Sequence, residues 1–310
     1  MRGFVLAAGF GTRMRPLTDH IPKALVPVCG MTLLERALRF IYENGIEKIG
    51  VNTHYLPEQL QVFQRRSSVP FELLVESGII RGTGGAFDYA REFLSGDDSF
   101  FMLNVDIVCQ FDLKTAIRKF TESDSICTLI AFPCEHGKGT ILFDNTTKGY
   151  SGTPSEIKQS DTMGEGAFIG AALYKKTFLD MVTRDDFSIV PVWKRAVDIG
   201  HKVTVNIQNT GYWRDIGTVK ALADIHFECI DNALLLDIPQ KISCVRADKI
   251  CIPSECVSRK SALTGKYAWV ESCLFDGSTV TNSIVWSDTD IRNKHIENSL
   301  YTPYGVISIS

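Results

Sequence analysis

The residues best suited to chemistry lie near the start of the chain, in a glycine-rich segment followed by cationic side chains. Residues 6–18 read Leu-Ala-Ala-Gly-Phe-Gly-Thr-Arg-Met-Arg-Pro-Leu-Thr, and Lys23 follows. Gly9 and Gly11 have no Cβ, so the backbone can approach an anion closely and turn its N–H groups toward it. The guanidinium of Arg13 offers a fork of donors to phosphate oxygens, and Lys23 offers a point charge. This pattern indicates a triphosphate site.

The segment lies between a predicted strand and a predicted helix. Residues 4–6 form a short apolar run, and residues 33–41 have helical spacing. Open parallel sheets bind ligands at the carboxyl ends of their strands, which is where this loop would lie. The glycines match neither the Walker A spacing nor the dinucleotide fingerprint. Taken alone, the glycines favour an ordinary strand–helix turn with solvated arginines.

Strands and helices alternate along the first 240 residues. The sequence predicts strands over residues 46–52, 71–76, 100–107 and 126–132, and a helix over residues 57–63. Residues 140–190 suggest a small insertion of short strands and turns that includes 168–174. A strand over 203–207 and a helix over 219–236 follow. This order predicts an α/β fold with a doubly wound, Rossmann-like, mostly parallel sheet.

The pattern changes from about residue 242. Apolar residues recur at roughly six-residue steps, and Asn-Ser-Ile at 282–284 is echoed by Asn-Ser-Leu at 298–300. Short repeats of this kind predict hexapeptide-like coils of a parallel β-helix, and an irregular β appendage is the alternative. We therefore expect a catalytic domain over residues 1–240 and a β-helix-like domain over residues 241–310.

The composition disfavours a nucleic-acid-binding, membrane-spanning or secreted protein. The net charge is −3, whereas a protein that binds nucleic acid would more often be basic. No apolar run has the length of a membrane span, and we expect no signal peptide. The nine cysteines are scattered without a Cys-x-x-Cys pair, so we expect reduced thiols packed as small hydrophobes in a cytoplasmic protein.

Residues 6–28 as a whole closely resemble the signature of the sugar-1-phosphate nucleotidyltransferases. The match continues through Pro-Lys-Ala-Leu-Val-Pro-Val at 22–28, where Ala24 replaces the usual proline. The resemblance implies an enzyme whose partners are an NTP and a sugar 1-phosphate, which yields an NDP-sugar and pyrophosphate and uses Mg²⁺. Many members carry a left-handed β-helix tail, which supports that interpretation here. Exposed β-helix edges lead us to expect a homo-oligomer.

The resemblance also implies roles for individual residues. Arg13 would hold the leaving pyrophosphate and Lys23 would touch the phosphates, and both are taken as catalytic. Residues 82–85 resemble the family's second glycine loop, and Glu76 lies near the position that bonds the base edge. The nucleotide-binding set is Leu6, Ala7, Ala8, Gly9, Gly11, Thr12, Glu76, Gly82, Thr83 and Asn104. The base stays open among UTP, GTP, dTTP and CTP.

Two aspartates are expected to hold the metal. Asp106 follows a predicted strand beside the glycine-rich loop, although position alone would equally suit a cap or a solvated turn. Asp215 lies in Trp-Arg-Asp-Ile-Gly-Thr at 213–218, which resembles the motif whose aspartate completes the metal site. For the sugar phosphate, the resemblance points to Glu156, Lys158 and Gly170; a surface role for the lysine is the alternative.

One departure from the family pattern opens an alternative function. Where members have Asn-Gly-Asp, this chain has Val105 between Asn104 and Asp106. Two methyl groups beside the sugar could block catalysis, which would make the chain a catalytically weak regulatory or assembly relative that binds nucleotide sugar. A dinucleotide-dependent oxidoreductase is disfavoured by the glycine spacing.

Overall fold

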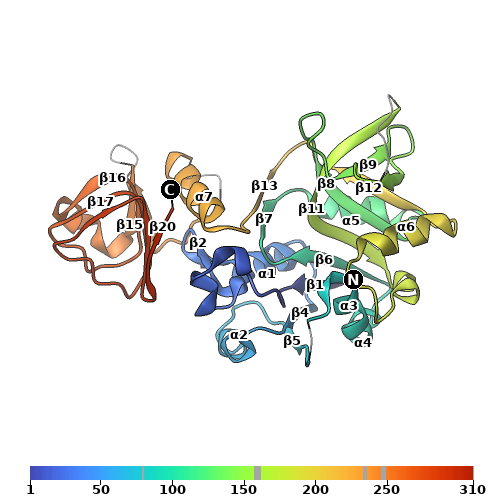
Figure 1. Cartoon of the computed structure of the whole chain (residues 1–310), viewed down its shortest axis with the longest axis horizontal. Coiled ribbons are helices and arrows are strands. Elements are labelled where there is room, and N and C mark those ends of the chain that lie inside the picture. Colours follow the sequence, from blue (N-terminus) through green and yellow to red (C-terminus); the bar gives the residue numbers. More distant parts are fainter. Residues whose placement is uncertain (79, 157–161, 233–235, 246–248, 310) are drawn as a thin grey trace. The chain divides into compact units, whose positions relative to one another are not determined.

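Backbone contacts divide the chain into two compact units (Figure 1). The computed structural model describes residues 1–309 except 79, 157–161, 233–235 and 246–248. The first unit comprises Met1–Phe10 and Leu34–Asp215, and the second comprises Gly11–Leu33 and Ile216–Ser310. The chain thus passes from one unit to the other inside the glycine-rich segment, which contributes residues to both.

The first unit is built on a nine-stranded sheet with a parallel centre. Its four parallel strands are β1 (Arg2–Leu6), β4 (Ile49–Thr53), β5 (Glu72–Val75) and β6 (Ser99–Asn104). The chain moves outward from β1 through β4 to β5 and then returns to β6 on the other side of β1. The strand order therefore reverses between β1 and β6, the topological switch point at which such sheets bind ligands.

The rest of this sheet is mixed. Antiparallel pairs join β11 (Met163–Lys175) to β6, β8 (Cys127–Phe132) and β9 (Ile141–Asp144), and β9 to β10 (Tyr150–Gly152). Only β12 (Val203–Ile207) runs parallel to β8. The strand predicted at 168–174 is thus longer than expected and antiparallel, because hairpin strands rather than a crossover helix precede it.

Helices cover both faces of the sheet, as predicted. They are α1 (Leu33–Glu43), α2 (Pro57–Gln64), α3 (Gly82–Tyr89), α4 (Arg91–Leu94), α5 (Leu113–Thr121) and α6 (Val190–Asp198), and the 3₁₀ segment η4 (Lys176–Met181) follows β11. Phe101 of β6 contacts Phe40 of α1 at 6.4 Å between ring centroids, whereas Phe100 contacts Phe87 of α3 at 5.4 Å. Successive side chains of a strand face opposite sides, so α1 and α3 lie on opposite faces.

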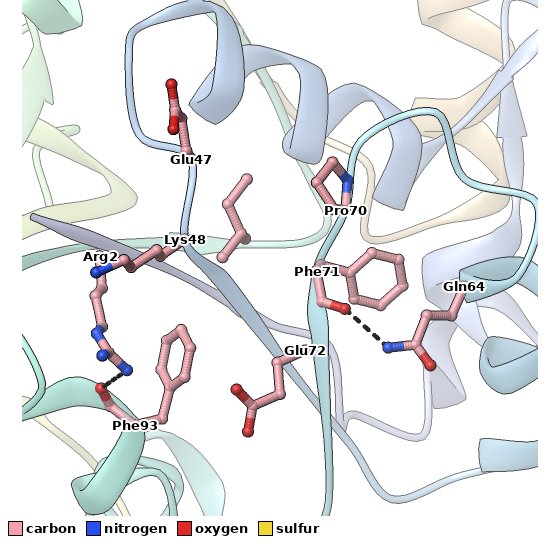
Figure 2. A pocket seen from close by; sticks show the side chains of 9 residues that line it. Arg2, Glu47, Lys48, Gln64, Pro70, Phe71, Glu72 and Phe93 are labelled. Carbon is pink, nitrogen blue, oxygen red and sulfur yellow. Dashed lines mark hydrogen bonds between the residues drawn. The ribbon is translucent and has the colours of Figure 1, made fainter.

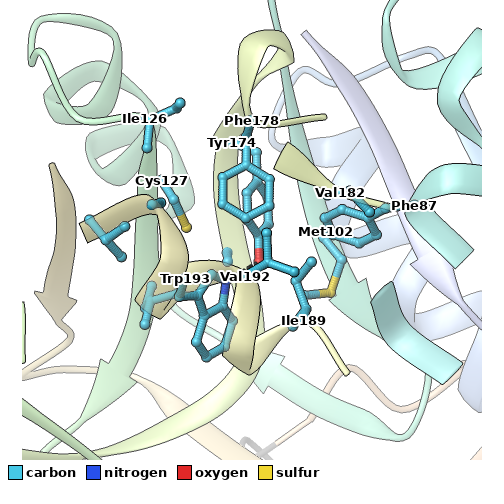
Figure 3. Close-up of a cluster of buried hydrophobic side chains, with 14 of the residues drawn as sticks. Phe87, Met102, Ile126, Cys127, Tyr174, Phe178, Val182, Ile189, Val192 and Trp193 are labelled. Atoms are coloured by element: carbon cyan, nitrogen blue, oxygen red, sulfur yellow. Dashed lines mark hydrogen bonds between the residues drawn. The ribbon is translucent and has the colours of Figure 1, made fainter. Parts of the chain in front are cut away.

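An aromatic cluster joins α3 and α6 to β11 (Figure 3). Trp193 of α6 donates its indole N–H to the hydroxyl of Tyr174 at 3.0 Å, and Tyr174 packs edge-on against Phe87 at 5.1 Å. All three side chains are buried. The polar atoms of Trp193 and Tyr174 are thus hydrogen-bonded to each other inside an apolar layer. This layer packs on β6 and β11.

The second unit contains residues 11–33, and α7 (Val219–Asp231) binds the turn at Cys29. His226 of α7 is fully buried; its Nε2 accepts from the Cys29 N–H at 3.0 Å and its Nδ1 donates to the Leu222 carbonyl at 2.7 Å. Cys29 lies between β2 (Pro27–Val28) and β3 (Met31–Thr32). The helix predicted over 219–236 ends at Asp231, and residues 233–235 lie outside the described part.

Parallel strands stack in the C-terminal part of this unit (Figure 1). Parallel pairs join β15 (Ile250–Pro253), β16 (Leu263–Val270) and β17 (Ser278–Val285) in turn, and β17 pairs with both β18 (His295–Glu297) and β19 (Ser299–Thr302). Antiparallel strands β14 (Ile242–Val245) and β20 (Gly305–Ser308) lie at the two ends, and the 3₁₀ segment η6 (Ser254–Ala262) follows β15.

The sequence echo in this tail corresponds to stacked positions. Ile284 pairs with Leu300, and Asn282 donates to the side-chain oxygen of Asn298 at 3.3 Å. Both asparagines have positive φ, 45° and 48°, a conformation that asparagine tolerates better than most residues. The predicted short parallel repeats are therefore present.

The expectation that all cysteines are reduced is wrong for one pair. Cys244 and Cys251 form a disulfide between directly opposed residues of β14 and β15. Opposed antiparallel residues lie close enough for this bond, which the scattered spacing of the cysteines did not reveal. Among the described residues, no helix is both long and apolar enough to cross a membrane.

Candidate active site

Three predicted site residues lie together at the carboxyl edge of the parallel strands. Leu6 pairs with Asn52 of β4 on one side and with Asn104 of β6 on the other. Gly170 of β11 lies against Asn104: a Cβ at Gly170 would lie 2.6 Å from the Asn104 side-chain nitrogen, and its φ is +72°. Only glycine suits this position, so the structure brings Leu6, Asn104 and Gly170 together at the switch point.

Asn52, which the sequence analysis did not select, fixes the start of the glycine-rich loop. Its Oδ1 accepts from the Ala7 N–H at 2.7 Å, and its Nδ2 donates to Oε1 of Glu76 at 2.7 Å. The side chains of Asn52 and Glu76 are only 2% and 3% exposed. Oε2 of Glu76 has no hydrogen-bond partner among the described residues. Glu76 therefore lies at the expected edge, as a buried carboxylate whose second oxygen is unpaired.

The two predicted metal ligands stand at one end of a separate ribbon of β7 (Ile107–Gln110) and β13 (Tyr212–Asp215). Asp106 lies in the turn between β6 and β7, and Asp215 pairs with Ile107, the residue after Asp106. Asp106 is half-buried and Asp215 is exposed. Carboxylate oxygens are the ligands that Mg²⁺ prefers, so this donor set fits that ion.

The side chain of Val105, beside Asp106, is covered by protein. It is 5% exposed, and its N–H donates to the Leu6 carbonyl at 3.1 Å. Little of Val105 is therefore presented at the surface of this edge. Neighbouring strand side chains face opposite ways, so this is consistent with Val105 pointing away from Asp106.

A thiol in the same ribbon has no nucleophilic role. Cys109 pairs with Trp213. Burial raises the pKa of the Cys109 thiol well above its usual range. The thiolate is the nucleophilic form, so this cysteine is inert near neutral pH.

The predicted second glycine loop is the first turn of α3. A Cβ at Gly82 would lie 2.1 Å from the Phe187 carbonyl oxygen, and one at Gly84 would lie 2.2 Å from that of Asp186. The hydroxyl of Thr83 accepts from the Ile189 N–H at 3.0 Å. Close packing against residues 186–189 therefore accounts for these glycines, and the predicted nucleotide contacts of Gly82 and Thr83 stay predictions.

The three predicted sugar-phosphate residues are not gathered by any described contact. Glu156 accepts from the N–H and the hydroxyl of Thr153 at 3.0 and 2.9 Å, in an exposed turn. Lys158 lies outside the described residues. Gly170 alone is placed at the switch point, through its contact with Asn104.

The remaining loop residues lie in the second unit and pack on one another. Gly11 has φ +65°, and a Cβ there would lie 2.8 Å from Cγ2 of Thr18 and 3.2 Å from Cβ of Lys23. The hydroxyl of Thr18 donates to the Gly11 carbonyl at 2.8 Å. Lys23 is 9% exposed, whereas Arg13 is exposed. The loop thus keeps one cation inside and presents the other to solvent.

A groove of about 500 Å³ lies at the opposite edge of the sheet (Figure 2). Arg2, Ile49 and Glu72, which line it, are at the amino ends of β1, β4 and β5. Arg2 donates to the Phe93 carbonyl at 2.6 Å across this groove. None of the predicted site residues lines it, so we do not assign it to the active site.

In the described part of the chain, one group of side chains other than the aspartates could hold a metal: Glu255, Cys256 and Cys273. The Cys256 and Cys273 sulfurs lie 2.7 Å apart, and Cys273 lies 3.1 Å from the Glu255 carboxylate. Burial, followed by the hydrogen bonds with Cys256 and Glu255, raises the pKa of Cys273 to about 12. The thiol is therefore protonated near neutral pH, and Cys256 packs in the apolar core of the tail.

Comparisons with known proteins support the α/β fold, and the match to a family model includes the glycine-rich segment. A family model described as nucleotidyl transferase matches residues 2–232. Mannose-1-phosphate guanyltransferase 2 of Candida glabrata is 27% identical over 236 residues, which cover 71% of this chain and 62% of that protein. The bifunctional protein GlmU of Methanococcus aeolicus is 29% identical over 251 residues, covering 78% and 57%. The chain thus spans less than two thirds of the length of either relative.

A solved structure is similar in fold. A putative glucose-1-phosphate thymidylyltransferase from Bacillus anthracis, in complex with a sucrose, superposes with a TM-score of 0.63. The match is 20% identical and covers 77% of this chain and 96% of that one. At this level of identity, the likeness shows the architecture alone.

The Asn52 bridge predicts a stability defect. Asn52→Leu keeps the side-chain size but leaves the Ala7 N–H and the Glu76 carboxylate without this partner. We expect the free energy of unfolding to fall by about 3 kcal/mol in urea titrations, because buried groups lose their hydrogen bonds. Asn145→Leu, at an exposed asparagine, is the control and should change it by less than about 0.5 kcal/mol. Equal effects of the two substitutions would contradict the bridge.

Proposed function

Because the chain belongs to the nucleotidyl transferase family, we propose that it transfers a nucleotidyl group from an NTP to a sugar 1-phosphate and releases pyrophosphate. The observation that carries the proposal is the position of the loop. Residues 6–10 leave β1 at the switch point, where Leu6 pairs with Asn104 and Gly170 lies against Asn104. The name of the Candida glabrata relative, which refers to mannose 1-phosphate, supports the substrate class.

A direct assay tests this proposal. Pyrophosphate release is measured for UTP, GTP, dTTP and CTP, each combined with a panel of hexose, heptose and amino-sugar 1-phosphates. We expect release with at least one pair and none when the sugar phosphate is omitted. The active pair identifies the base and the sugar. Absence of pyrophosphate from every pair would contradict the function.

The reaction requires little covalent chemistry from the side chains of the protein, because the attacking and leaving groups both belong to the substrates. An anionic oxygen of the sugar phosphate attacks the α-phosphorus, a new P–O bond forms, and the bond to the bridging α–β oxygen breaks. The electron pair of that bond leaves with pyrophosphate, so no proton has to move. The protein then contributes positioning and charge stabilisation.

We assign these two tasks to different parts of the loop. The backbone of Leu6–Gly9, fixed at Ala7 by Asn52, would hold the base and the sugar of the nucleotide. Arg13, which is exposed, would meet the departing pyrophosphate. Lys23, which is buried against Gly11, would neutralise phosphate charge from a fixed position.

Asp106 and Asp215 would hold Mg²⁺. Their location at one end of the β7–β13 ribbon, and the accessible side chain of Asp215, support this assignment. When bound, the ion would supply Lewis acidity and a template for the nucleotide phosphates. The two carboxylates would orient it from the edge that Asn104 and Leu6 share.

A second candidate function is the regulatory or assembly relative that binds nucleotide sugar without turnover. Its support was Val105 in place of the family's glycine. The burial of the Val105 side chain removes the reason for a blocked pocket, and both aspartates and both cations are kept. We therefore favour the catalytic function.

The tail and the assembly complete the proposal. We propose that the stacked parallel strands β15 to β17 are coils of a left-handed β-helix, supported by their parallel register. We also propose that this tail joins copies of the chain into a homo-oligomer. The cytoplasmic location stays a prediction, and the Cys244–Cys251 disulfide counts against the reduced thiols on which that prediction was based.

One prediction of the proposed function concerns the two carboxylates. Asp106→Asn and Asp215→Asn should each lower kcat about 100-fold or more, because each would weaken the binding of the ion that stabilises developing charge. Neither substitution should change the unfolding midpoint. Asp198→Asn, at a surface residue of α6 that is 60% exposed, is the control and should leave kcat unchanged. Wild-type turnover by both variants in saturating Mg²⁺ would rule out the assignment.

Arg13 provides a second test. Arg13→Lys keeps the charge but loses the fork, so we expect kcat to fall about 10-fold while KM for the NTP changes less than about threefold. Steady-state kinetics with the active substrate pair, and Arg65→Lys as the control, measure this. A raised KM with unchanged kcat would mean that Arg13 binds the NTP and its transition state equally.

The assembly is tested by the mass in solution. Light scattering of the full chain should give a whole-number multiple of the chain mass that is greater than one. The multiple should persist in about 0.5 M salt, because apolar β-helix contacts are not screened as ion pairs are. A monomeric mass at micromolar concentration would contradict the proposed oligomer.

A further inference from the structure

The tip of the last hairpin contacts the glycine-rich segment. Tyr304, between β19 and β20, stacks on His20 with ring centroids 4.9 Å apart and planes inclined by 6°. Both residues belong to the second unit. A small cavity of about 80 Å³ lies beside the stacked rings, lined by Pro16 and Leu17 of the loop and by hairpin residues. The hairpin tip therefore lies directly on the turn that follows Arg13.

His20 closes this turn. Its N–H donates to the Leu17 carbonyl at 3.2 Å, which ends the 3₁₀ segment η2 (Leu17–Asp19). Thr18, inside η2, is 1% exposed and donates its hydroxyl to the Gly11 carbonyl at 2.8 Å. The Tyr304 ring, by stacking on His20, therefore also restrains η2, from which the Thr18 hydroxyl donates to Gly11.

The same contacts reach the buried cation. A Cβ at Gly11 would lie 2.8 Å from Thr18 and 3.2 Å from Lys23, so Gly11 is packed between these two side chains. Lys23 begins the next 3₁₀ segment, η3 (Lys23–Leu25), and is 9% exposed. A continuous series of contacts therefore runs from the hairpin tip to Lys23.

The hairpin tip is itself well fixed. Thr302 is 3% exposed; its hydroxyl donates to the Gly305 carbonyl at 3.0 Å and accepts from the Tyr304 N–H at 3.1 Å. These bonds hold the backbone of Tyr304 even though its ring is 48% exposed. The ring is thus presented to His20 from a rigid base, as a positioning residue requires.

We propose that Tyr304 is a positioning residue for the phosphate-binding loop, and that the C-terminal tail holds the loop in its NTP-binding conformation through the Tyr304–His20 stack. The inference rests on the proposed function, since it takes the loop to bind an NTP. Tyr304 touches no substrate in this scheme; it acts through His20, Thr18 and Gly11.

The proposal has a distinct kinetic signature. Without the stack, the loop would occupy its binding conformation for a smaller fraction of time, and the apparent NTP affinity falls by that fraction. Saturating NTP selects the competent loop again. Tyr304→Ala should therefore raise KM for the NTP about fivefold, with kcat and KM for the sugar phosphate unchanged.

The experiment uses the chain of 310 residues and five variants. Tyr304→Ala and His20→Ala remove one ring each, and the double variant removes both. Tyr304→Phe keeps the ring and should behave as wild type. Tyr42→Ala, at a tyrosine of α1 that is 41% exposed, controls for the loss of a surface ring. Steady-state kinetics are combined with amide hydrogen exchange of residues 14–20 in the free protein.

Faster exchange of residues 14–20 and the raised NTP KM in Tyr304→Ala and His20→Ala, without further change in the double variant, would support the proposal. Unchanged exchange would overturn it, and so would a fall in kcat at constant KM, which indicates only loss of folded protein. If the wild type releases no pyrophosphate with any substrate pair, the proposed function fails. The exchange data would still decide whether the hairpin orders the loop.

Discussion

A buried hydrogen-bonded bridge sets the backbone from which the proposed chemistry is built. Asn52 joins the Ala7 N–H to the Glu76 carboxylate, and so ties the ends of β1, β4 and β5 together. Both side chains are almost inaccessible to water, so an alternative arrangement would leave polar groups unpaired at a cost in free energy. The loop therefore leaves β1 in one direction, next to the strand end that carries Asn104.

The glycine-rich segment is shared between two compact units, and each unit fixes it by different means. In the first unit, hydrogen bonds at the sheet edge hold Ala7. In the second, side-chain packing around Gly11 and the stack on His20 hold the residues that carry Arg13 and Lys23. In the two proposals made above, the tail both orders the loop and joins copies of the chain.

Local sequence patterns predicted the elements, whereas distant contacts decided the details. Hydrophobic periodicity identified the helix at 33–41 and the central strands, and the loop signature identified the switch point. Residues 82–85 were expected to form a loop, but they form a helix start because residues 186–189, distant in sequence, pack against them. Asn52 and Tyr304 went unnoticed, since their roles depend on partners that only the fold brings near.

The proposed nucleotide site lies at the carboxyl edge of the sheet, between β1 and β6. Amide hydrogen exchange with and without a non-hydrolysable NTP analogue and Mg²⁺ locates the bound ligand. We predict slower exchange on binding at residues 6–14 and 104–107, and no change around the groove that Arg2 and Glu72 line at the amino edge. Protection confined to that groove, with residues 6–14 unchanged, would contradict the account.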